Sequence, residues 1–319
     1  MYKIKQIPED FIVDEITNIK PHESGRYIYY KLKKTNYTVL RALEHIAAIL
    51  RIPLKRIGFA GTKDKLAITT QFISFDSVKK EKIDCITLKD IKLEFFGYGN
   101  EPISLGDLEA NQFCIIIRNM EKEPKSITEL PNYFGPQRFS DNNTDIGKSI
   151  IKKDFRKAAE LISESDNQFT TTSMTYLKKR PNDFIGLIRQ LPKKLLMLYI
   201  HSYQSYIWNQ TVKQLIAKEI KKDKINIIGF ATELKDDEEG NIIRSIINKD
   251  NITPRDFIIR SIPELSSEGT QRNMYIKVMK LNISEPEEDD MNKGKNKYKI
   301  KFMLPKGSYA TIVIDQIAA

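Results

Sequence analysis

The chain has 319 residues, of which 40% are hydrophobic and 9% aromatic, so it is long and apolar enough to form an ordered globular protein of two domains. Its 52 Lys and Arg residues exceed its 42 Asp and Glu residues, which gives a formal net charge of +10. This excess favours a polyanionic partner, because Lys and Arg neutralise phosphates and release counterions, although many basic proteins bind no nucleic acid.

The cysteines, histidines and apolar runs exclude several other classes of protein. Cys85 and Cys114 are the only two cysteines and form no Cys-x-x-Cys pair, so a disulfide framework is excluded and a reducing, cytoplasmic location is expected. His22, His45 and His201 are scattered along the chain, so we expect no metal site. No apolar run is long enough to span a bilayer and the N-terminus has no signal segment, so we expect no contact with a membrane.

The first 140 residues are rich in the alternating apolar pattern that is typical of strands. One helix interrupts them: Thr38 is its predicted N-cap, apolar residues recur at helical spacing from Val39 to Leu50, and the helix ends before Pro53. Strands are predicted for residues 1–7, 11–16, 26–33, 54–59, 67–75, 89–95 and 113–118. The last of these is a continuous apolar run and therefore the most central strand.

The middle of the chain changes to helical spacing, and strands return towards its end. Helices are predicted for residues 146–162 and 199–220, and a solvated turn for residues 235–241. Strands are predicted for residues 274–281, 298–304 and 309–317. Acidic residues at 285–290 and basic residues at 293–299 predict an exposed, mobile hairpin. The sequence therefore predicts one sheet domain whose chain is interrupted by an inserted domain.

A short loop between two predicted strands, residues 58–65, carries the most distinctive set of polar residues. In Lys63-Asp64-Lys65 the two lysines favour the ionised form of the carboxylate, which could then act as a nucleophile, a general base or a metal ligand. The same residue types are common in ordinary hairpin turns, so a purely structural role stays open. A phosphate-binding P-loop is excluded, because only two residues separate Gly58 from Gly61 and Asp64 stands where that motif has a hydroxyl residue.

Residues 131–139 combine three aromatic residues, two prolines, a glycine and an arginine, which is incompatible with a regular helix or strand. Aromatic rings beside an arginine suit stacking on a nucleobase. A loop that fills a gap in the core would use the same residues, so both interpretations stay open.

Five blocks of the sequence resemble, in the same order, the TruD family of tRNA pseudouridine synthases, the group that acts on uridine 13. The blocks are residues 8–15 (PEDFIVDE), 60–65 (AGTKDK), 105–113 (LGDLEANQF), 132–139 (NYFGPQRF) and 304–311 (LPKGSYAT). Weaker similarities to the inserted domain of the family occur at residues 202–206 and 269–272. Five blocks in order are far more specific than one, and they cover most of the predicted sheet domain.

The resemblance implies an α+β fold and an activity. The fold would be a pseudouridine-synthase-like mixed, mainly antiparallel sheet with flanking helices, formed by residues 1–144 and 276–319 and interrupted by an inserted α/β TRUD domain, residues 145–275. The activity would be isomerisation of uridine to pseudouridine in tRNA at position 13, with no cofactor. The even spread of charge gives no reason to expect a dimer, so we expect a monomer.

The resemblance also implies roles for individual residues. Asp64 would be the nucleophile, Phe134 would stack against the target base, Asn132 would help to position the base, and Tyr309 would pack in the same pocket. Lys5 stands where the family tends to carry a basic active-site residue, so we assign it to pairing with Asp64 or with a phosphate; Lys63 could do the same or face solvent. The alternative is a non-catalytic RNA-binding or RNA-chaperone protein on the same fold.

Overall fold

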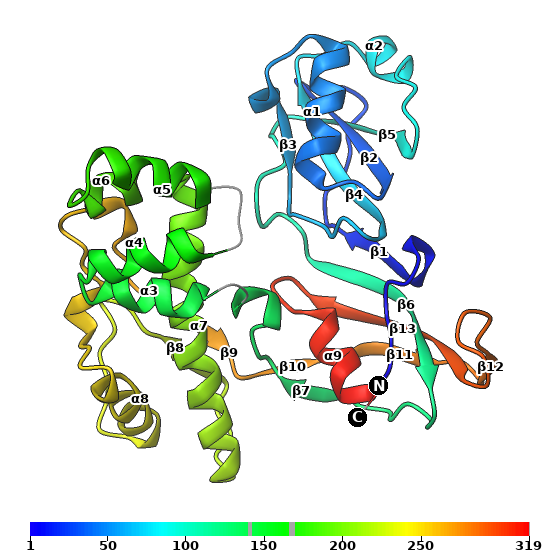
Figure 1. The fold of residues 1–319 in the computed structure, drawn as a ribbon. Helices are drawn as coiled ribbons and strands as arrows, with labels where there is room; N and C mark the ends of the chain where they lie inside the picture. Colours follow the sequence, from blue (N-terminus) through cyan, green and yellow to red (C-terminus); the bar gives the residue numbers. More distant parts are fainter. Residues whose placement is uncertain (140–141, 166–169, 319) are drawn as a thin grey trace. The chain divides into compact units, whose positions relative to one another are not determined.

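The structure, a computed structural model, describes residues 1–139, 142–165 and 170–318 and divides the chain into two compact units (Figure 1). The first unit is Met1–Leu130 with Ile276–Ala319, and the second is Pro131–Tyr275. These compact units divide before Pro131 and before Ile276, and the domain boundaries expected from the resemblance follow residues 144 and 275. Residues after Pro131 belong to the second unit because they pack there on helix α7 (Lys193–Ala217), where the Phe134 amide donates to Asn209 Oδ1 at 2.9 Å.

The first unit is built on a nine-stranded sheet in the order β11-β13-β6-β1-β4-β2-β5, with β12 paired to β13 and β3 paired to β4. Strands β1 and β4 run parallel, and the other neighbouring pairs run antiparallel, so the expected mainly antiparallel α+β fold is confirmed. The strands are β1 (Phe11–Ile16), β2 (Tyr27–Thr35), β3 (Ile57–Phe59), β4 (Ile68–Asp76), β5 (Ile91–Gly99), β6 (Ala110–Met120), β11 (Met279–Ile283), β12 (Glu287–Glu288) and β13 (Asn296–Pro305).

Two helices cover the same face of this sheet towards its two ends. Helix α1 (Val39–Leu50) begins after Thr38, whose side chain accepts a hydrogen bond from the Arg41 amide, so the predicted N-cap is confirmed. It packs on β2, β3 and β4. Helix α9 (Ala310–Ile317) packs on β1, β6 and β13, around the stacked rings of Phe113 and Phe302. The register of the strands places both apolar clusters on one face.

Between the two apolar clusters this face carries a buried polar strip, which we define as Glu15, Lys34, Thr69 and Gln71. The residues come from β1, β2 and β4, and each is at most 5% exposed. Buried polar groups are costly unless they are hydrogen-bonded, so this part of the sheet needs a polar cover rather than an apolar helix. The loop of residues 60–67, between β3 and β4, supplies that cover.

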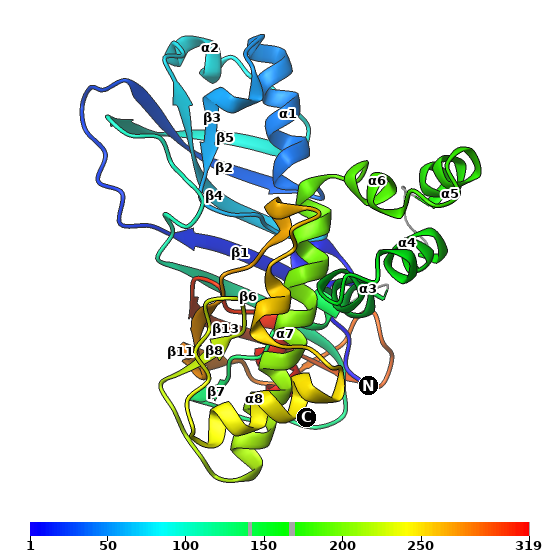
Figure 2. The ribbon, with the colours of Figure 1, turned by 90° about the vertical axis from the view of Figure 1, so that its left-hand side faces the viewer.

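The second unit is mainly helical and is organised around α7, whose Tyr199, Tyr203 and Trp208 are each at most 1% exposed. Its helices and strands are α3 (Asn143–Ile151), α4 (Phe155–Glu164), α5 (Thr170–Lys179), α6 (Phe184–Arg189), β8 (Lys224–Ile227), α8 (Glu238–Lys249) and β9 (Thr270–Asn273). Strands β8 and β9 form a two-stranded sheet, and at the unit boundary β7 (Glu129–Pro131) pairs with β10 (Tyr275–Lys277). Figure 2 shows α7 running along this unit with α8 beside its C-terminal half.

The predicted final strand, residues 309–317, is wrong: the segment is helix α9. Its buried residues, Ala310, Val313, Ile314 and Ile317, recur at spacings of three and four. A short apolar run does not by itself distinguish a buried strand from a buried helix, and here the helical arrangement buries the apolar side chains.

Other differences from the predicted elements arise from caps and local turns. Residues 54–56 form a 3₁₀ turn, so only Ile57–Phe59 is a strand, and residues 1–7 form no strand but a single bridge from Lys3 to Arg118. Asp154 caps α4 and Asp237 caps α8, which divides the predicted helix 146–162 and starts a helix inside the predicted turn 235–241. The acidic hairpin after β11 is not simply exposed, because Asp289 is 3% exposed and bonds to Arg118.

A substitution at Gly58 tests how closely β3 packs against the rest of the sheet. A Cβ at this position would lie 2.3 Å from the Ile103 carbonyl oxygen and 2.6 Å from Ser74 Oγ, so we expect Gly58→Ala to displace β3 and to lower the free energy of unfolding by about 1–3 kcal/mol. At Gly61 a Cβ would meet only side-chain atoms, 3.6 Å away or further, so Gly61→Ala is the matched control. Urea unfolding curves measure both, and equal midpoints for the two variants would contradict this packing.

Candidate active site

The loop of residues 60–67 crosses the sheet at a gap in the strand pairing. Strand β1 pairs with β4 from Ile68 to Thr70, and β3 pairs with β4 from Ile73 onward, which leaves residues 71–72 without a strand partner on that side. Glu15, near the end of β1, fills the gap, since its Oε1 accepts from the Phe72 amide at 3.2 Å. The buried backbone donor is thereby satisfied by a carboxylate instead of by a strand.

The same carboxylate anchors the loop. Lys63 Nζ lies 2.6 Å from Glu15 Oε2, and the two side chains are 7% and 0% exposed. Gln71 Nε2 donates to the Gly61 carbonyl at 3.4 Å and adds a second link from the polar strip to the loop. Lys63 therefore neither faces solvent nor bonds to Asp64; its ammonium is held by Glu15.

Lys34, a third member of the strip, supports the backbone of Asp64. Its Nζ donates to the carbonyl oxygens of Tyr37 at 2.5 Å and Asp64 at 2.9 Å. Burial lowers the pKa of Lys34 to about 8, the charge of Asp64 opposes this shift, and the charge of Lys63 adds to it. Lys34 is not among the site residues expected from the sequence. The available signal is its position: it continues the alternation of the buried residues Tyr30 and Leu32, where a lysine is unusual.

Asp64 itself points away from the strip and is paired by a residue from the N-terminus. Lys5 Nζ lies 3.2 Å from Asp64 Oδ2, and the two side chains are 17% and 40% exposed. The Lys5 ammonium also lies 4.0 Å from the centroid of the Phe11 ring. The structure thus brings Lys5 and Asp64 together and leaves the carboxylate accessible to a substrate.

The third and fifth sequence blocks meet the same loop. The Gly106 amide donates to the Ala60 carbonyl at 2.8 Å, and Gly106 adopts the positive φ of 97° that favours glycine. Lys306 Nζ donates to the Gly106 carbonyl at 2.8 Å. Tyr309 is partly buried and caps the N-terminal end of α9, on the turn that follows β13.

Asn132 and Phe134 lie in the second unit, where both contact Arg272. Asn132 accepts from Arg272 twice, through its carbonyl oxygen at 3.0 Å and through Oδ1 at 2.6 Å. The Arg272 guanidinium lies 4.2 Å from the centroid of the Phe134 ring, and the Trp208 ring meets Phe134 edge-on. Phe134 is 8% exposed, so the packing role considered for it is present within this unit. Arg272 was part of a weak motif, and its role was not predicted.

A pocket of about 400 Å³ opens beside Phe134 within the second unit, lined by residues that include Arg138, His201, Gln204 and Thr270. Burial, with the nearby charge of Arg138, lowers the pKa of His201, so its imidazole is neutral at physiological pH. Within the described ranges no cluster of three His, Cys, Asp or Glu side chains could hold a metal ion, and no helix is long and apolar enough to cross a membrane.

Known proteins of one family are similar to this chain along nearly its whole length. A family model described as tRNA pseudouridine synthase D (TruD) matches residues 2–173, 165–226 and 223–317. A relative from Methanococcoides burtonii, named "Probable tRNA pseudouridine synthase D", is 30% identical over 98% of this chain and 92% of its own length. One from Aquifex aeolicus, named "tRNA pseudouridine synthase D", is 28% identical over 99% and 97%. A crystal structure described as that of the "Putative tRNA pseudouridine synthase D (TruD)" from Methanosarcina mazei is 29% identical, has a TM-score of 0.78, and covers 99% of this chain and 93% of its own.

Lys34 gives the folded protein a pH-dependent stability. From about pH 8 up to the usual lysine pKa of 10.5, the unfolded chain keeps a proton that the folded chain has lost, so the free energy of unfolding gains up to about 1.4 kcal/mol per pH unit as the pH rises. The free energy of unfolding of wild type, measured with urea, should therefore increase relative to that of Lys34→Met between about pH 8 and about pH 10. Lys33→Met, at an exposed neighbour, is the control. A constant difference over this range would contradict the assignment.

Proposed function

The chain belongs to the TruD family of tRNA pseudouridine synthases, and on that premise we propose that it isomerises uridine 13 of tRNA to pseudouridine with Asp64 as the nucleophile. The observation that carries the proposal is the pairing of the accessible Asp64 carboxylate with Lys5 at 3.2 Å, on a loop fixed from below by buried bonds. A nucleophile of this kind needs to be ionised and held still before the substrate arrives.

The chemistry requires little beyond such a carboxylate. Isomerisation replaces the bond from the ribose to N1 of uracil with a bond to C5, while a proton leaves C5 and N1 becomes protonated. Asp64 attacks the uridine and detaches the base, which rotates and rejoins the ribose through carbon. The reaction consumes no energy source and needs no cofactor. Reaching the base requires it to leave the stack, at a cost of a few kcal/mol.

The remaining residues act on the bound RNA. We assign Phe134 to stacking on the target base, Asn132 to positioning it, and Tyr309 to packing in the same pocket. The Asn132–Arg272–Phe134 contacts support a fixed ring in the second unit. Lys5 supplies positive charge beside the proposed nucleophile, and Lys63 holds the loop that carries it through its ion pair with Glu15.

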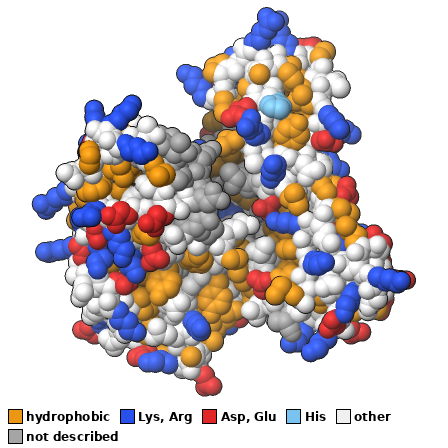
Figure 3. Space-filling view, viewed as in Figure 1, with side chains coloured by type: hydrophobic (Ala, Val, Ile, Leu, Met, Phe, Trp, Pro, Cys, Tyr) orange, Lys and Arg blue, Asp and Glu red, His pale blue; other side chains and the backbone are white. Residues whose placement is uncertain are grey.

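The partner is tRNA, and the protein acts in the cytoplasm as a monomer. The formal charge of +10 suits a polyanionic substrate. On the face drawn in Figure 3, Lys and Arg side chains are interspersed with Asp and Glu side chains, and this spread of charge gives no reason to expect a second copy of the chain.

Asp64→Asn tests the nucleophile. The substitution keeps the shape of the side chain and removes its charge, so we expect the single-turnover rate of pseudouridine formation in tRNA to fall by about 10³-fold or more. Glu94→Gln, on the exposed face of β5, removes a carboxylate from the same sheet and should leave the rate unchanged. Normal conversion by Asp64→Asn would refute the assignment. Tight tRNA binding by wild type without any pseudouridine would instead favour a non-catalytic RNA-binding protein.

Binding of tRNA should weaken steeply with salt, because several phosphates are neutralised and release their counterions. We expect the dissociation constant to rise by at least about tenfold between 50 and 200 mM salt. Filter binding or fluorescence anisotropy with unmodified tRNA measures it. An affinity that is flat over this range would contradict phosphate neutralisation as the main source of binding.

A further inference from the structure

The position of Lys5 depends on an unusual backbone conformation. Lys5 has a φ of 57°, in the left-handed region that residues with a side chain seldom occupy, and this conformation directs its ammonium to Asp64. A non-glycine residue there costs of order 1 kcal/mol or more, so the flanking residues must hold it in place.

The residues on both sides of Lys5 are fixed by hydrogen bonds. Before it, the backbone of Lys3 exchanges two hydrogen bonds with the backbone of Arg118, at 2.9 and 2.8 Å. After it, the amides of Gln6 and Ile7 donate to Asp10 Oδ2 at 3.0 and 3.2 Å. The segment is therefore clamped at one end by β6 and at the other by the Asp10 carboxylate.

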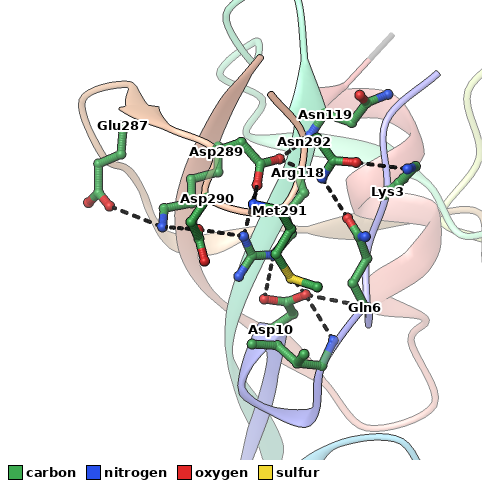
Figure 4. Close-up of polar contacts among 12 residues, drawn as sticks. Lys3, Gln6, Asp10, Arg118, Asn119, Glu287, Asp289, Asp290, Met291 and Asn292 are labelled. Carbon is green, nitrogen blue, oxygen red and sulfur yellow. Dashed lines mark hydrogen bonds and ion pairs between the residues drawn. The ribbon is translucent and has the colours of Figure 1, made fainter. Parts of the chain in front are cut away.

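Arg118 links these two clamps through its side chain (Figure 4). Its guanidinium is 3% exposed; Nε donates to both oxygens of Asp10, at 2.9 and 3.0 Å, and Nη1 donates to Asp289 and Asp290, each at 2.9 Å. Burial tends to raise the pKa of Asp289, but hydrogen bonds from the Asn119 and Met291 amides, Asn292 and Arg118 lower it to about 2. Asp289 is thus ionised at neutral pH.

The hairpin that carries Asp289 also reaches the segment directly. Asn292 Oδ1 accepts from Lys3 Nζ at 2.7 Å, and Asn292 Nδ2 donates to Gln6 Oε1 at 2.8 Å. One side chain thus spans the residues that precede and follow Lys5. Among the hydrogen bonds and ion pairs of the described residues, those of Arg118 and Asn292 do not include Asp64, so any effect on Asp64 passes through Lys5.

We propose that Arg118, with Asp10 and the Asn292 hairpin, is a positioning device that holds Lys5 against the Asp64 carboxylate. The inference rests on the proposed role of Asp64 and adds to it a set of residues, far apart in sequence, that set the rate without touching the RNA. Loss of these contacts leaves Asp64 in place but no longer holds the Lys5 ammonium beside its carboxylate.

The test is a double-mutant cycle with Lys5→Met. Asn292→Ala removes the two bonds across Lys5 from a partly exposed site, and Arg118→Lys removes the bidentate contact; we expect the single-turnover rate at saturating tRNA to fall about three- to tenfold and about ten- to hundredfold. In the Lys5→Met enzyme, which is itself slow, the same changes should alter the rate less than about twofold. Glu287→Gln, exposed on the same hairpin and paired only with Lys297, is the matched control and should leave the rate unchanged.

Thermal unfolding of each variant separates positioning from folding. If Arg118 and Asn292 had a merely structural role, their substitution would lower the stability and the rate by the same factors in wild type and in Lys5→Met. That additive result would overturn the proposal. A normal rate in Lys5→Met or in Asn292→Ala would overturn it as well. If Arg118→Lys does not fold, the Asn292→Ala cycle decides alone. None of these outcomes bears on Asp64→Asn, whose failure would reject the proposed function instead.

Discussion

The proposed active site depends on a discontinuity in the sheet. Between the positions where β1 and β3 pair with β4, residues 71–72 have no strand beside them, and Glu15 takes the place of the missing backbone acceptor. Because that carboxylate is fully buried, it requires a cation, and Lys63 provides it at 2.6 Å. Removing one partner of a buried pair leaves an unpaired charge that costs about 3–5 kcal/mol, so the pair fixes which loop conformation covers the gap.

Because the buried Glu15–Lys63 pair holds the loop, Asp64 is left for the proposed reaction. Glu15, Lys34 and Gln71 project from the sheet and bind the loop through the Lys63 side chain or through loop carbonyl groups. The Asp64 side chain is 40% exposed; its backbone carbonyl accepts from Lys34, and its carboxylate pairs with Lys5. A carboxylate held in this way stays accessible, which a carboxylate buried as an anchor of the fold could not do. Glu15, which is buried, anchors the loop, whereas Asp64, which is exposed, stays accessible.

Local sequence patterns predict the elements whose signals are local. Thr38 capping α1, and the alternation in β2, β4 and β13, follow from residues within a few positions of one another. Asp64 could be singled out because two lysines flank it and because its loop is one of the five blocks that resemble the family. Helix α9 was mistaken for a strand because a nine-residue apolar run fits either period, and the choice is made by packing against β6 and β13. The division of the compact units before Pro131 has no local signal, because the contact of Phe134 with Asn209 is a tertiary one.

The electrostatics of Asp64 show why the rest of the site is not readable from sequence. The two lysines beside it suggest how its charge is favoured, yet Lys63 pairs with Glu15, and the cation at 3.2 Å is Lys5, in the N-terminal segment that precedes β1. Adjacent residues in an irregular loop point in different directions, so sequence neighbours are poor guides to charge pairs. Lys5 in turn takes its conformation from Arg118 and Asn292, more than a hundred residues further along the chain. The charge environment of Asp64, the proposed nucleophile, is therefore a property of the folded sheet, and any chain that keeps the loop but loses the N-terminal segment would keep the acid without its cation.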